Sequence, residues 1–335
     1  MSKVIKIAFL FCLLCSGSVL IRAQAPKEIG LESISERAAR AHIGFLAHDE
    51  LQGREAGHAG GRIAAAYIQS YLKELGLQPF LGTGYAQAFK AYRVHFQTKG
   101  RWTIDPTAGN GKSEEPHHCL PMQNILAVLP GMTDELVIVG AHYDHLGQQV
   151  GLVKDSIYNG ADDNASGVSA VLQLAKAFVE SGVQPLRTLV FAFWDGEEKG
   201  LLGSTYFVQN YSRIHTVKSY LNFDMIGRNN KPEEPQHVVY FYTQKYPLFE
   251  EWLKSTISTY QLSLKPEIKA WDKPTSGSDN APFALHDIPI IWYHTDGHPD
   301  YHQPTDEVDL LNWSKIVAIT QSAYLNTWML VNEEY

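Results

Sequence analysis

Continuous apolar runs alternate with amphipathic segments along most of this chain. A short run without polar interruption is typical of a strand that is buried on both faces. Such strands are predicted at residues 124–129, 136–140, 188–194, 220–223, 237–242 and 289–293. A helical spacing of apolar positions predicts helices at residues 35–48, 61–75, 168–179, 247–260 and 312–331. Residues 85–111 mix β-forming residues with turn residues, which predicts an edge hairpin.

Buried strands that alternate with helices predict the α/β class, with a mostly parallel sheet between two layers of helices. No linker rich in proline or serine, no block of like charge and no internal repeat divides the 335 residues. That length allows two domains, but α/β enzymes of this size are often one domain. We therefore expect a single three-layer α/β/α domain over residues 24–335.

The N-terminus has the pattern of a secretory signal peptide. Lys3 and Lys6 precede an apolar run over residues 7–14, and small residues follow it. The run is too short to span a membrane as a helix. Cleavage after Ala23 is expected, so residues 1–23 form the signal and the mature protein is exported to the periplasm or secreted.

Composition narrows the function classes further. The chain has 28 basic and 36 acidic residues and a net charge of −8, which argues against nucleic-acid binding. Of its three cysteines only Cys119 lies beyond the predicted signal, so no internal disulfide is expected in the mature chain. Stability must then come from the core and from any bound ligand.

Polar segments follow three of the predicted strands. They read A-H-Y-D-H at 141–145, W-D-G-E-E-K-G at 194–200 and L-N-F-D-M-I-G at 221–227. In open α/β sheets the ligand crevice lies beyond the carboxyl ends of the strands. His142, the Glu197–Glu198 pair and Asp224 are therefore expected to converge there, although they lie far apart in sequence.

These residue types suit a metal-dependent hydrolase. Zinc takes imidazole and carboxylate ligands, and of two adjacent glutamates one can bind metal while the other accepts a proton from metal-bound water. Asp224 lies within an apolar stretch, where an unpaired carboxylate is costly, so metal ligation explains it. Asp144 is the natural partner for the second ring nitrogen of His142. Ordinary surface turns, a solvated loop and helix capping are the alternatives for these segments taken singly.

Two further segments supply candidates. In G-A-D-D-N-A-S-G at 160–167, two adjacent acids would repel each other unless one meets a cation, although the composition also fits a turn. P-D-Y-H-Q-P at 299–304 places His302 in a loop, where a lone histidine usually has no function. Together with the earlier segments they describe a two-zinc site, because a carboxylate can bridge two ions.

The order of these motifs, preceded by D-E-L-Q-G-R-E at 49–55, resembles the secreted bacterial di-zinc aminopeptidases. That family also includes glutamate carboxypeptidases and glutaminyl cyclases. The resemblance extends from about residue 37 to residue 328 and implies a central mixed sheet, two zinc ions per chain and peptide substrates. S-D-N at 278–280 departs from it, since many relatives have Ser-Asp-His there.

The resemblance also implies roles for residues. The family's metal ligands fall on His142, Asp163, Glu198, Asp224 and His302. Asp163, not Asp162, would bridge the two ions, His142 and Asp224 would complete one site, and Glu198 and His302 the other. Glu197 would be the general base, and Tyr301 would hydrogen-bond the tetrahedral intermediate. The Asp163–Asn164 peptide bond is predicted to be cis.

An aminopeptidase that releases N-terminal residues is the favoured function. One alternative is a glutaminyl cyclase that uses a single zinc for acyl transfer; Tyr301 stands where those cyclases have tryptophan, and no insertion follows Glu198. A carboxypeptidase or dipeptidase of the same family is another. A non-catalytic binding module is the last, and the complete ligand set argues against it. Side-chain specificity and oligomeric state stay open.

Overall fold

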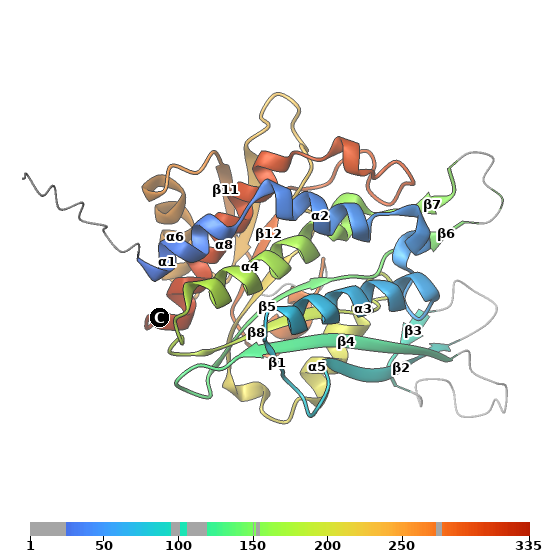
Figure 1. Cartoon of the computed structure of the whole chain (residues 1–335), viewed down its shortest axis with the longest axis horizontal. Coiled ribbons are helices and arrows are strands. Elements are labelled where there is room, and N and C mark those ends of the chain that lie inside the picture. Colours follow the sequence, from blue (N-terminus) through green and yellow to red (C-terminus); the bar gives the residue numbers. More distant parts are fainter. Residues whose placement is uncertain (1–24, 95–100, 106–118, 150, 152–154, 273–276) are drawn as a thin grey trace, which may run out of the picture.

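The computed structural model describes residues 25–94, 101–105, 119–149, 151, 155–272 and 277–335 (Figure 1). The predicted signal peptide, residues 1–23, lies outside the described residues. In the described part of the chain, no helix is both long enough and apolar enough to span a membrane.

A mixed sheet of ten strands, counted over the described residues, forms the middle layer, and the strands at its centre run parallel. These central strands are β8 (Thr188–Trp194), β5 (Leu136–His142), β9 (Val217–Phe223) and β12 (Ile290–His294). Beyond β8, the order continues with the antiparallel strands β4 (Cys119–Leu129), β2 (Ala86–Val94) and β3 (Arg101–Thr103), and β1 (Gln78–Pro79) pairs with β4. Beyond β12 lie β10 (His237–Tyr242), antiparallel to β12, and β11 (Lys265–Ala270), parallel to β10.

Helices cover both faces of this sheet. One face carries α1 (Pro26–Ser33), α2 (Glu36–Leu46), α3 (Ala59–Glu74), α4 (Gly167–Ser181), α6 (Pro247–Thr259) and α8 (Trp313–Asn332). The other carries α5 (Leu202–Asn210) and α7 (Asn280–Ala284). Along β8, side chains alternate between the two cores: Leu189, Phe191 and Phe193 face the first, and Val190, Ala192 and Trp194 face the second. Burial on both faces explains the continuous apolar runs and confirms the predicted three-layer fold.

Most predicted elements have the expected type. The helix predicted from residue 35 is α2, and the side chain of Ser35 accepts a hydrogen bond from the backbone N–H of Ala38 as its N-cap. The predicted edge hairpin is described in part, as the antiparallel pair of β2 and β3. The run at 124–129 is a strand, but it pairs antiparallel with β8, because an apolar run carries no information on strand direction.

The remaining elements are short connections. They are the 3₁₀ segments η1 (Asp49–Arg54), η3 (Ile214–Thr216) and η4 (Val308–Leu310), the kinked helical turn η2 (Ala161–Ser166), and the two-residue strands β6 (Gly147–Gln148) and β7 (Ile157–Tyr158). Two of them, η1 and η2, lie next to the polar cluster described below.

Candidate active site

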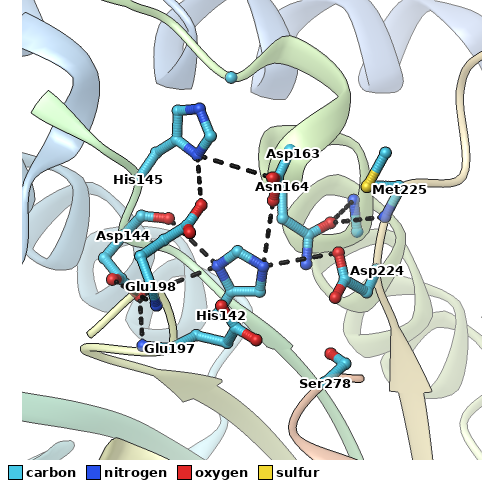
Figure 2. A network of polar contacts seen from close by, with 12 residues as sticks. His142, Asp144, His145, Asp163, Asn164, Glu197, Glu198, Asp224, Met225 and Ser278 are labelled. Carbon is cyan, nitrogen blue, oxygen red and sulfur yellow. Dashed lines mark hydrogen bonds and ion pairs between the residues drawn. The ribbon is translucent and has the colours of Figure 1, made fainter. Parts of the chain in front are cut away.

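The predicted site residues come together at the carboxyl ends of the parallel strands. His142 is the last residue of β5, Glu197 and Glu198 follow β8, and Asp224 follows β9 (Figure 2). Two come from elsewhere: Asp163 lies in η2, just before α4, and His302 lies in the loop after β12. Parallel strands end at the same edge of a sheet, so residues that lie far apart in sequence share one site.

Asp163 faces two different histidines with its two carboxylate oxygens. Its Oδ1 lies 3.3 Å from His142 Nε2, and its Oδ2 lies 3.2 Å from His302 Nε2. The same nitrogen of His142 is 3.5 Å from Asp224 Oδ1, and the same nitrogen of His302 is 3.2 Å from Glu198 Oε2. Two groups of ligand atoms therefore share one carboxylate, which is the arrangement of a two-cation site.

The pKa shifts of His142 and His302 indicate how strongly the carboxylates of this cluster stabilise positive charge. Burial alone lowers the pKa of His142, but Glu197, Asp224 and Asp163 outweigh it and raise the pKa well above its usual range. Burial also lowers the pKa of His302, yet hydrogen bonding to Asp163 and Glu198 raises it to about 10. A cluster of carboxylates that favours positive charge on both imidazoles is a donor set that fits bound metal ions.

Glu197 lies beside the first group. Its carboxylate, a nitrogen of His142 and a carboxylate oxygen of Asp224 all lie within 4.8 Å of one another. Burial raises the pKa of Glu197 well above its usual range, and the negative charges of Glu198 and Asp279 add to this effect. A carboxylate with a raised pKa is suited to accept and return a proton.

Asp144 contacts the site differently from the expected imidazole–carboxylate pair. The Nδ1 atom of His142 lies 3.1 Å from the main-chain carbonyl oxygen of Asp144 and 3.8 Å from its Oδ1. The carboxylate instead accepts the backbone N–H groups of Glu197, at 3.0 Å, and Glu198, at 3.3 Å. Asp144 therefore fixes the turn that presents both glutamates (Figure 2).

His145 is a contact that the sequence reasoning missed. Its ring is buried, and its Nδ1 lies 2.7 Å from Glu198 Oε1, while Glu198 Oε2 faces His302. Groups that hydrogen-bond a metal ligand fix its orientation, and this is the position of His145 relative to Glu198. The second histidine of A-H-Y-D-H was the available signal.

The adjacent acids of η2 point in different directions. Asp162 Oδ1 accepts the backbone N–H of Gly227 at 2.6 Å, and its Oδ2 lies 3.4 Å from His298 Nε2. Asp163 alone of the pair faces His142 and His302. The Asp163–Asn164 peptide bond is cis, which confirms that prediction.

A cavity of about 150 Å³ opens over the cluster. Besides the cluster itself, Trp292, His294 and Tyr301 form part of its wall. The ring of Tyr301 stacks on that of His302 with 3.8 Å between centroids. Although 45% of Tyr301 is exposed, its partial burial and the nearby Asp163 raise the pKa of its phenol, which stays protonated at neutral pH and can donate a hydrogen bond.

The S-D-N departure lies in a buried polar network beneath the site. The side-chain amide of Asn222 donates to Ser278 Oγ at 2.8 Å and to Asn280 Oδ1 at 3.4 Å. Asp279 accepts a hydrogen bond from Ser204 Oγ at 2.5 Å. Asn280 therefore contacts β9 through Asn222, and it is absent from the described wall of the cavity.

Comparison with known proteins places the sequence in a family. Residues 124–326 match the model of peptidase family M28. The leupeptin-inactivating enzyme 1 of Streptomyces exfoliatus is 27% identical over 280 residues, covering 83% of this chain and 52% of that protein. A probable leucine aminopeptidase of Arthroderma otae is 36% identical over 137 residues, covering 38% of each. The chain thus spans about half the length of these relatives, or less.

Solved structures agree on the fold. A zinc aminopeptidase of Bacillus subtilis superimposes with a TM-score of 0.67 at 16% identity, covering 90% of this chain and 97% of that one. A glutaminyl cyclase of Porphyromonas gingivalis superimposes with a TM-score of 0.63 at 17% identity, covering 88% and 99%. At such identities the likeness establishes the fold alone. The match of the family model over more than half of the sequence shows that the chain belongs to peptidase family M28.

Proposed function

We propose that this protein is an exported aminopeptidase that uses two zinc ions. One observation carries the proposal: the two oxygens of Asp163 face His142 and His302 separately, at 3.3 and 3.2 Å. A carboxylate placed between two nitrogen donors, each with a further carboxylate beside it, is suited to bridge two cations. The relative named as a leucine aminopeptidase supports the choice of reaction.

The donor set supports zinc. Imidazole nitrogen and carboxylate oxygen are ligands that zinc takes in catalytic sites. His142 and Asp224 would hold one ion, Glu198 and His302 the other, and Asp163 both. Bound zinc would supply Lewis acidity toward a carbonyl oxygen and a water of lowered pKa.

The chain's own residues would divide the remaining work. Glu197 would accept a proton from the attacking water and deliver it to the leaving amine, for which its raised pKa is suited. Tyr301, with its protonated phenol at the cavity wall, would donate a hydrogen bond to the developing oxyanion.

The charge of the cavity wall favours cleavage at the amino end. Its described lining includes the carboxylates of Asp163, Glu197 and Asp224 and contains no lysine or arginine among the described residues. Asp163 and Asp224 would be occupied as zinc ligands, but no lysine or arginine of this described lining offers the cation that would bind a C-terminal carboxylate. This supports an aminopeptidase over a carboxypeptidase.

Export rests on the N-terminal pattern of basic, apolar and small residues before Ala23. N-terminal sequencing of the mature protein from its native host tests it. A first residue of Gln24 is expected, and an unprocessed Met1 in mature protein would contradict export through this signal.

A substrate panel tests the reaction. Aminoacyl-anilides, N-acetylated peptides and peptides with N-terminal glutamine are each assayed with and without a chelator, and zinc is counted by elemental analysis. We expect cleavage of the free-amine substrates only, loss of activity with chelator and close to two zinc ions per chain. Release of pyroglutamyl peptide with one zinc would instead identify a cyclase, and cleavage of the blocked peptides an endopeptidase.

A further inference from the structure

Arg54, in the D-E-L-Q-G-R-E segment, is a buried arginine with an unusual set of partners. Its side chain is buried, with a relative exposure of 1% for the residue. Its guanidinium donates four hydrogen bonds, all to main-chain carbonyl oxygens. The acceptors are Tyr143 at 3.0 Å, Leu46 at 2.6 Å, Asn159 at 2.5 Å and Gly160 at 3.0 Å.

Three of these carbonyls belong to segments next to candidate ligands, and the fourth, that of Leu46, lies at the end of α2. Tyr143 directly follows His142 at the end of β5, and Gly160 directly precedes η2, which contains Asp163. One side chain therefore joins the two segments whose ligands face each other across 3.3 Å. Arg54 is not a candidate ligand, yet its side chain donates hydrogen bonds to both the segment after β5 and the segment before η2.

The chemistry of arginine suits this position. Burial lowers the pKa of Arg54 to about 10, while the negative charge of Asp163 acts in the opposite direction, so the group stays charged at neutral pH. Taking that charge out of water is costly and is offset only when its donors are satisfied. The planar guanidinium has five N–H donors in a fixed geometry, whereas lysine offers three on a single nitrogen.

The backbone around Arg54 is wedged between the same segments. Gly53 has a φ of 69°, and a Cβ at this position would collide with the carbonyl oxygens of Gly147 and Tyr158. On the other side, Glu55 forms an ion pair of 2.8 Å with Lys199, which follows Glu198. Residues 53–55 thus contact the segments after β5, before η2 and after β8.

We propose that Arg54 is a positioning residue for the metal centre: its hydrogen bonds to Tyr143, Asn159 and Gly160 hold the segment after β5 and the segment before η2 at the separation that lets His142 and Asp163 share a cation. This inference rests on the zinc site proposed above. It assigns to residues 49–55 a role in metal affinity, although none of them lies among the candidate ligands.

Arg187 offers a matched control. It is also buried, with a relative exposure of 1%, and it donates to the carbonyl oxygens of Leu330 at 3.0 Å and Glu333 at 2.5 Å. It precedes β8, at the opposite end of the strand from Glu197 and Glu198. A change at Arg187 therefore removes a comparable set of bonds without touching the metal centre.

The experiment compares wild type with Arg54→Lys, Arg54→Gln and Arg187→Lys. Zinc affinity is measured by competition with a chromogenic chelator, and unfolding free energy by urea titration. Both Arg54 variants are expected to bind zinc roughly 10–100-fold more weakly, the range typical for changes to groups that orient metal ligands. Arg187→Lys is expected to lose stability and keep wild-type zinc affinity.

Three outcomes would overturn the proposal. Wild-type zinc affinity in Arg54→Lys together with weakened binding in Arg54→Gln would mean that charge alone matters. Equal losses of affinity in Arg54→Lys and Arg187→Lys would mean a general effect on the fold. An Arg54→Lys variant that does not fold also counts against it, because the guanidinium would then be required for the whole fold and not for the metal centre alone. Failure of the wild type itself to bind zinc would instead refute the proposed function.

Discussion

Replacing Asp144 with asparagine tests how the two glutamates are held in place. In the structure its carboxylate accepts the backbone N–H groups of Glu197 and Glu198. An amide has one oxygen acceptor, so Asp144→Asn leaves one of these N–H groups without a partner. An unpaired buried N–H costs about 1–3 kcal/mol of stability. If the turn shifts to relieve it and the activation barrier rises by about 2 kcal/mol, kcat/KM falls roughly 30-fold.

The contact between Asp144 and the imidazole of His142 predicts which of the two zinc sites the substitution affects. His142 Nδ1 is closer to the main-chain carbonyl of Asp144, at 3.1 Å, than to its carboxylate, at 3.8 Å, and the substitution preserves that carbonyl. The variant should therefore show a lower kcat, measured with an aminoacyl-anilide, and weaker binding of the zinc that Glu198 holds. Binding of the ion at His142 should change less.

A control and a contrary result complete this test. Asp134, whose side chain is 76% exposed and pairs with Arg213, should tolerate the same change to asparagine with no effect on kcat. Unchanged activity and zinc affinity in Asp144→Asn would show that the second oxygen of Asp144 does not act as an acceptor, and the reasoning would fail.

Three further changes have defined outcomes. Glu197→Gln should keep both zinc ions by elemental analysis while kcat falls roughly 10²–10⁴-fold, and loss of zinc would make Glu197 a ligand instead. Tyr301→Phe removes one hydrogen-bond donor, so kcat should fall roughly 10²–10³-fold with zinc content unchanged; an unaltered kcat would exclude the oxyanion role. Burial lowers the pKa of His42 from 6.5 to about 4. Burying the neutral imidazole therefore requires no loss of a proton above pH 6.5, whereas the free energy of unfolding decreases as pH falls from 6.5 toward 4. Urea titrations at pH 7 and pH 4.5 should show a loss of about 2–3 kcal/mol in wild type that His42→Gln lacks, and parallel losses would contradict it.

The fold could be predicted where burial leaves a mark in the sequence. The run at 188–194 has the bounds of β8, because side chains on both faces of that strand are buried. By contrast β11 was not predicted: its pattern has no buried position, it begins Lys-Pro-Glu, and it lies at the edge of the sheet. The helix α5 was missed for a similar reason, since its apolar residues are mixed with Gly, Ser and Thr.

The candidate ligands could be predicted from the sequence for a related reason. Acidic and imidazole residues placed directly after apolar runs are conspicuous, and the ends of parallel strands bring them together. His145 and Arg54 were not identified because their partners are long-range: the carboxylate of Glu198 for one, and carbonyls up to Gly160 for the other. Main-chain carbonyl acceptors have no signature in a sequence.

The site combines two ways of holding a ligand. His142 and Asp224 stand at strand ends, where the hydrogen-bond ladder of the sheet fixes the backbone, and Glu198 lies on the turn after β8 that Asp144 holds. Asp163 and His302 lie on connecting segments, and buried side chains take over that task.

Asp306 is central among those side chains. Its carboxylate accepts the backbone N–H of Asp163 at 3.0 Å and lies 3.6 Å from Arg228 Nη1. Arg228 in turn forms an ion pair with Asp300, two residues before His302. The pair of Asp306 and Arg228 thus contacts the segments that carry Asp163 and His302. Substitutions at Asp306 and Arg228 should therefore lower metal affinity more than they lower the stability of the fold. The same is expected for Arg54, which bonds to Gly160 on the N-terminal side of Asp163.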